Sequence, residues 1–303
     1  MKLTDFKSFL ILTIFSIFFN CIYASDLTAF YKVAVLKTTF EDAKNKTESA
    51  LKSKGFEIIG GYSPVKDKSM YVMTFTRKDL QEVTSKIEPN GILASVMRIG
   101  YLSDSLGNIE ISLLNPEYVF YGFLRDAISD YEIELSSIAN DVKESLSALG
   151  GSFEPYGSTL EEHQLKMFRY IAKYPAFEDI LQINEQEFNS FDEGLATVLF
   201  NLKSQKGGAV KVYEIINKEK QYALIGIGLT DKNTGEGLLL DVLGKKYIAA
   251  LPYQMIISGK KAFVLPGRFV LPFYWSHETM ATFRTINRLP KDLEYTLSSL
   301  TKK

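Results

Sequence analysis

The stretch from Tyr247 to Trp275 constrains the fold of this chain more than any other. Two runs of strand-forming residues, Ile248–Ile257 and Ala262–Leu265, flank a short polar turn, which predicts a β-hairpin. The same plan occurs upstream, where Leu93–Leu102 and Ile109–Asn115 flank a second turn. A chain that carries one pattern twice is predicted to contain one structural unit used twice.

The predicted helices in front of the two hairpins repeat as well. Thr39 precedes the helical run Phe40–Leu51, and Ser190 precedes the run Phe191–Leu202, each with a hydroxyl cap followed by acidic residues. Strand-like segments follow both helices, so the sequence predicts a two-module α+β protein. At 303 residues the length also favours about two domains.

We place the first unit at 25–151 and the second at 178–303. Between them, the segment Ser152–Gly157 (SFEPYG) has the proline and glycine of a boundary. Residues Leu160–Tyr174 are expected to form a bridging helix within a linker over 152–177.

The N-terminus has the pattern of a secretion signal over residues 1–24. Lys2 and Lys7 precede an apolar run at Phe9–Phe19, which is too short to span a bilayer as a helix. Cleavage after Ala24 would leave a mature chain without a transmembrane segment, in the periplasm or outside the cell. The alternative is a lipoprotein acylated at Cys21, which is the chain's single cysteine.

Several function classes are disfavoured. The formal net charge of −1 lacks the basic excess that nucleic-acid binding requires. The sequence contains neither the phosphate-binding pattern GxxxxGK nor the nucleophile pattern GxSxG. We therefore assign no catalytic residue and expect no cofactor, and the sequence favours a protein that is not an enzyme.

Longer segments of both units are similar to a known family. The first unit contains TTFEDAKNKTESALKSKGFEII and SLLNPEYVFYGFL, and the second contains SFDEGLATVLFNLKSQ, IAALPYQMII and VLPGRFVLP. Both resemble the domain-of-unknown-function family 302 (DUF302), over about 29–149 and 178–300. The family's Leu-Pro pair survives at Leu251-Pro252 but becomes Leu93-Ala94, and its Cys-Asn-Pro segment is absent from both units.

The resemblance implies two tandem units, each a curled antiparallel sheet backed by helices, and implies no established reaction. Each sheet has one apolar face and few helices to cover it. We therefore expect the two units to pack together as a pseudo-dimer within one chain.

A cluster in the second unit is the candidate ligand site. Tyr253, Arg268, Tyr274 and Trp275, with Phe273, combine aromatic faces and a guanidinium, which suit a flat or anionic ligand. The alternative is that these aromatic residues, which lie beside prolines, cover the core at the end of a sheet.

A metal site has less support. His277-Glu278 begins like the zinc motif HExxH, but position 281 is alanine, so Ser276 is better interpreted as a helix cap. His277 and Met280 remain candidate ligands of haem iron or copper. The sequence thus favours an exported, non-enzymatic binding or interaction protein whose partner is a small molecule or a protein. The alternative is a haem- or copper-carrying accessory factor of a redox or sulfur pathway.

Overall fold

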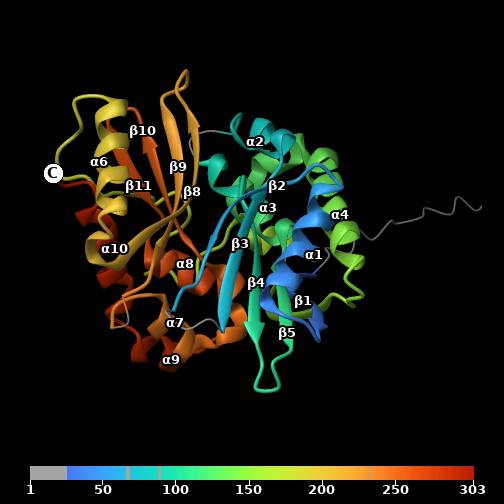
Figure 1. The fold of residues 1–303 in the computed structure, drawn as a ribbon. Helices are drawn as coiled ribbons and strands as arrows, with labels where there is room; N and C mark the ends of the chain where they lie inside the picture. Colours follow the sequence, from blue (N-terminus) through green and yellow to red (C-terminus); the bar gives the residue numbers. More distant parts are fainter. Residues whose placement is uncertain (1–25, 66–68, 88–89, 232) are drawn as a thin grey trace, which may run out of the picture.

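The computed structural model describes residues 26–65, 69–87, 90–231 and 233–303, so the predicted signal segment and Cys21 lie outside the described residues. The chain folds into two antiparallel sheets that lie side by side (Figure 1). The first sheet has the order β2-β3-β4-β5-β1-β6. Its strands are β1 (Asp26–Leu36), β2 (Glu57–Tyr62), β3 (Met70–Thr76), β4 (Met97–Ser103), β5 (Ile109–Leu114) and β6 (Glu154–Glu161).

The second sheet has the order β7-β11-β10-β9-β8. Its strands are β7 (Leu181–Gln182), β8 (Ala209–Asn217), β9 (Tyr222–Leu229), β10 (Tyr253–Ser258) and β11 (Lys261–Val264). In both sheets the strand that comes first in the chain, β1 or β7, pairs with the last strand of the following four. The two sheets therefore share one strand order, to which β6 is added at the edge of the first.

Helices back both sheets, as the α+β prediction requires. Figure 1 shows α1 and α4 at one end of the molecule and α6 and α10 at the other, with the sheets between them. The first half contains α1 (Phe40–Lys52), α2 (Lys78–Thr84), α3 (Pro116–Leu124), α4 (Glu132–Ser147) and α5 (Glu162–Lys166). The second contains α6 (Phe191–Lys203), α7 (Glu236–Leu243), α8 (Gly267–Tyr274), α9 (Met280–Thr285) and α10 (Leu289–Ser299).

The predicted caps of α1 and α6 are confirmed. The Thr39 hydroxyl accepts a hydrogen bond from the backbone N–H of Asp42, and the Ser190 hydroxyl accepts one from that of Glu193. Each bond satisfies one of the free N–H groups that every helix start leaves. No helix of the described ranges is both long and apolar enough to cross a membrane.

Both predicted hairpins start later than the sequence indicated. Residues 245–250 form the 3₁₀ helix η4, and residues 91–94 form η1, so the strands begin only at Tyr253 and Met97. The apolar residues expected to extend the strands are instead buried in these 3₁₀ turns. An apolar run in the sequence indicates that the segment is buried, but it does not distinguish a strand from a buried helical turn.

The segment between the units also differs from the expectation. Residues 154–161, which include most of the expected boundary segment at 152–157, form β6 and pair with β1, with Lys32 opposite Glu154. Without β6, that side of β1 would expose unpaired backbone groups. In place of the expected bridging helix, the chain forms only α5, which is five residues long and ends at Lys166.

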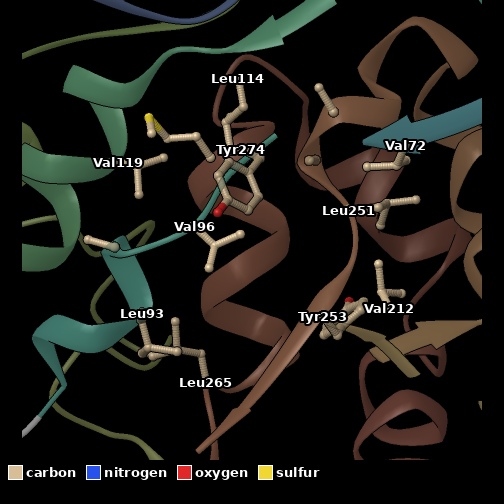
Figure 2. Packing of buried hydrophobic residues seen from close by; sticks show 14 of the residues in the cluster. Val72, Leu93, Val96, Leu114, Val119, Val212, Leu251, Tyr253, Leu265 and Tyr274 are labelled. Carbon is tan, nitrogen blue, oxygen red and sulfur yellow. The ribbon is translucent and has the colours of Figure 1, made fainter. Parts of the chain in front are cut away.

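The two halves share one hydrophobic cluster. Figure 2 shows Val96 and Leu114 of the first half close to Tyr274 of the second, and Val72 close to Leu251. The backbones approach closely at β2 and β8, where a Cβ on Gly60 would lie 1.9 Å from the carbonyl oxygen of Val212. The core therefore continues from one sheet into the other.

Candidate functional site

The structure separates the four predicted ligand residues. Tyr274 and Trp275, at the end of α8, face inward and are 2% and 1% exposed, and Tyr253 of β10 is buried beside them. Arg268, at the start of the same helix, is exposed. Three of the four residues therefore meet, and the guanidinium expected to complete the cluster lies elsewhere.

The three aromatic residues line a small cavity between the two halves, which we call the interface cavity. The first half supplies Arg98 of β4 to its wall, and Gln254 also lines it. Its volume is about 20 Å³, which is enough for one or two water molecules. An organic ligand does not fit there, because the space holds little more than one water molecule and the surrounding side chains, among them Tyr253, Tyr274 and Trp275, are buried.

Arg268 lies at a second pocket, which we call the arginine pocket. Arg284 of α9 and Tyr174, from the segment between the halves, share its wall, and its volume is about 50 Å³. The Arg268 guanidinium lies over the Tyr174 ring, 6.0 Å from the ring centroid, close enough for a cation–π interaction. The remaining lining is Gly267, Leu271, Pro272, Phe283, Ile286, Asn287 and Pro290.

The start of α8 fixes Arg268 at this pocket. Gly267 packs directly on α10, where a Cβ would lie 2.9 Å from Cα of Pro290. Its backbone N–H donates to Oε1 of Glu294 over 2.8 Å. This carboxylate therefore occupies the helix N-terminus, and Arg268 extends from the next residue.

Two exposed positive side chains, Arg268 and Arg284, line the pocket, so a ligand bound there can extend into the solvent. Among the described residues, no ion pair joins Arg268 or Arg284 to a carboxylate. Burial raises the pKa of Glu294, and the hydrogen bond from Gly267 and the charge of Arg268 act in the opposite direction. Two guanidinium groups beside an aromatic ring and an apolar floor can bind a carboxylate while the floor receives its apolar part.

Sequence reasoning identified Arg268 but missed its neighbours. Tyr174 was expected within a bridging helix, and Arg284 lies on α9, the second helix after the predicted hairpin. The three residues lie on separate segments of the chain, so no periodic pattern in the sequence predicts that they meet. Only the folded structure brings them together.

Both ring nitrogens of His277 are hydrogen-bonded. Nε2 lies 2.9 Å from the Tyr247 hydroxyl, and Nδ1 lies 3.1 Å from Oγ of Ser158. Since Ser158 donates its own proton to the carbonyl oxygen of Tyr274 over 3.0 Å, its Oγ accepts from Nδ1–H, and Nε2 accepts from Tyr247. Burial lowers the pKa of His277, which favours this neutral form.

Metal binding at His277 would break one of these two hydrogen bonds. Met280 is partly exposed at the first position of α9. The cap of that helix is Thr279 and not Ser276, because the chain makes a turn after Trp275 before the helix begins. Within the described parts of the chain, no group of three or more histidine, cysteine, aspartate or glutamate side chains is arranged to hold a metal ion.

Comparison with known proteins adds a fold neighbour. Neither a protein-family model nor a curated protein matches the sequence. A solved structure, that of an uncharacterised conserved DUF302 protein from Bacillus stearothermophilus, is similar to this chain, with 16% sequence identity and a TM-score of 0.28. The similarity covers 40% of this chain and 95% of that protein. The neighbour belongs to the family that the sequence resembles. It is described as uncharacterised, so it indicates no activity for this chain.

Proposed function

We propose that this protein is an exported binding protein, without a catalytic role, that holds a small organic carboxylate in the arginine pocket. The observation that carries the proposal is the pair of guanidinium groups, Arg268 and Arg284, beside the Tyr174 ring, neither of which forms an ion pair with a carboxylate of the described chain. Phe283 and Leu271 give the same pocket an apolar wall. Arginine binds carboxylates through two parallel hydrogen bonds, so the arrangement suits this ligand class.

Calorimetric titration at low salt tests the pocket, with acetate, benzoate and phenylacetate as probes. We expect at least one aromatic carboxylate to bind with one-to-one stoichiometry. Arg268→Gln and Arg284→Gln should each weaken it by about tenfold or more, because a hydrogen bond to a charged group contributes about 1.5–3 kcal/mol. Arg288→Gln, which removes an exposed arginine outside the pocket, should change nothing. Absence of binding by all three probes, or equal losses in all three variants, would refute the proposal.

We also propose that the two halves are copies of one DUF302-like unit, paired as a dimer would be. The shared strand order supports this. So does a reciprocal exchange of hydrogen bonds: Arg98, the second residue of β4, donates to the carbonyl of Ala250 in η4 over 2.8 Å. Gln254, the second residue of β10, donates to that of Leu93 in η1 over 3.2 Å. Such reciprocity is typical of two-fold interfaces.

Export is proposed from the basic start and apolar run of the N-terminus. Intact-mass analysis of protein from its native compartment should show a chain that begins near Ser25. A diacylated Cys21 would instead establish the lipoprotein alternative. A retained Met1 would contradict export by either route.

A further inference from the structure

Arg98 is a buried cation without a carboxylate partner. Its side chain is 3% exposed at the junction of the two halves. Nη1 donates to the carbonyl of Ala250 over 2.8 Å and contacts the Tyr274 hydroxyl at 3.3 Å, but among the described residues no ion pair joins the guanidinium to an acid. A buried charge is costly unless an opposite charge or strong hydrogen bonds compensate it.

Three buried polar atoms near this charge have no hydrogen-bond partner within the described structure. They are Nε of Arg98, the hydroxyl of Tyr253 and Nε1 of Trp275. All three residues line the interface cavity. The arginine and tryptophan nitrogens only donate, and the tyrosine hydroxyl can also donate. These three donors thus lack an acceptor in the described structure.

The nearest buried acid does not supply this acceptor. Glu236 is fully buried and is not part of the cavity wall. Its Oε2 accepts a hydrogen bond from the Tyr62 hydroxyl over 2.7 Å, and its Oε1 has no partner in the described structure. Burial raises the pKa of Glu236 to about 8, so this carboxyl is mostly protonated at neutral pH. The charge of Arg98 lowers the pKa of Glu236, but no ion pair joins the two side chains in the described chain, so Glu236 offsets this positive charge only in part.

We propose that the interface cavity is a binding site for a single monatomic anion of the size of chloride. The ion accepts hydrogen bonds from Nε of Arg98, Nε1 of Trp275 and the hydroxyl of Tyr253. The volume of about 20 Å³ admits one such ion and excludes an organic carboxylate, so this site differs from the arginine pocket in both place and ligand. Since Arg98 belongs to the first half and the other two residues to the second, the anion joins the halves.

Thermal unfolding of the full-length protein at constant ionic strength tests the proposal. Sodium chloride or bromide is exchanged for sodium gluconate, whose anion is too large for the cavity. We expect the midpoint to rise with halide concentration and to saturate, by about 5 °C at a hundredfold excess over the dissociation constant. Arg268→Gln should leave the halide effect unchanged, which separates this site from the arginine pocket.

Tyr253→Phe removes the hydroxyl and keeps the ring, and Trp275→Phe removes the indole N–H and leaves a smaller aromatic ring. Both variants should fold and lose most of the halide effect. Tyr295→Phe, at an exposed ring, is the matched control. A crystal grown in bromide should show an anomalous peak within hydrogen-bond distance of Arg98 Nε and Trp275 Nε1. Equal midpoints in all salts, or a cavity that holds water only and gives no bromide peak, would overturn the proposal.

Discussion

Replacing Leu51 by alanine is expected to lower the free energy of unfolding by about 2–5 kcal/mol. Leu51, in the first half, ends the apolar face of α1 and is fully buried in the hydrophobic cluster that the two halves share. The substitution removes three buried carbon atoms and leaves a cavity that close-packed neighbours fill only partly. Urea unfolding followed by circular dichroism measures the change.

The matched control is Leu106→Ala. Leu106 lies in the turn between β4 and β5 of the same half, and 85% of it is exposed. It should change the free energy of unfolding by less than about 0.5 kcal/mol. If the two substitutions cost the same, α1 does not pack on the sheet as described.

Glu236→Gln is expected to remove a large part of the protein's dependence on pH. Burial raises the pKa of Glu236 to about 8 in the folded chain, although the Tyr62 hydrogen bond opposes the shift. Between the ordinary value of 4.5 and this value, the unfolded chain releases the proton and the folded chain keeps it. The stability of the wild type therefore falls with rising pH in this window, by at most about 1.4 kcal/mol per pH unit.

The variant has no such proton. Its free energy of unfolding, compared with that of the wild type, should increase steadily from about pH 4.5 and level off near pH 8. Comparing the two proteins cancels the contributions of other titrating groups, such as Glu294 and Asp141, whose pKa values are shifted in opposite directions. Glu219→Gln, at an exposed turn, should show no comparable trend. A constant difference between Glu236→Gln and the wild type would contradict the buried, protonated carboxyl.

The sequence predicted the fold class because the signals for it are local. Caps such as Thr39 and Ser190 act within a few residues of themselves, so their pattern is visible in the chain. The exact strand starts at Met97 and Tyr253 were not predicted, because the preceding apolar residues are buried in 3₁₀ turns against the other half. The role of 154–161 as β6 depends on pairing with β1, which lies more than a hundred residues upstream.

The candidate site was predicted only in part for the same reason. Arg268, Tyr274 and Trp275 are neighbours in the chain, but α8 directs Arg268 to one side and the two aromatic residues to the other. Tyr174, Arg284 and Arg98 become their partners only through contacts between distant segments. Residue types and spacing indicated that an arginine and aromatic rings would meet, and the tertiary packing determined which ones.

The most direct test of the paired arrangement follows the unfolding of both halves of the full-length chain in urea. Trp275, the protein's single tryptophan, reports on the second half by fluorescence. Hydrogen exchange at the amides of β3 and β4 reports on the first. We predict one shared midpoint, which Leu51→Ala lowers equally for both signals although Leu51 lies in the first half. Two separate midpoints, or a Trp275 transition that Leu51→Ala leaves unchanged, would contradict a single cooperative body.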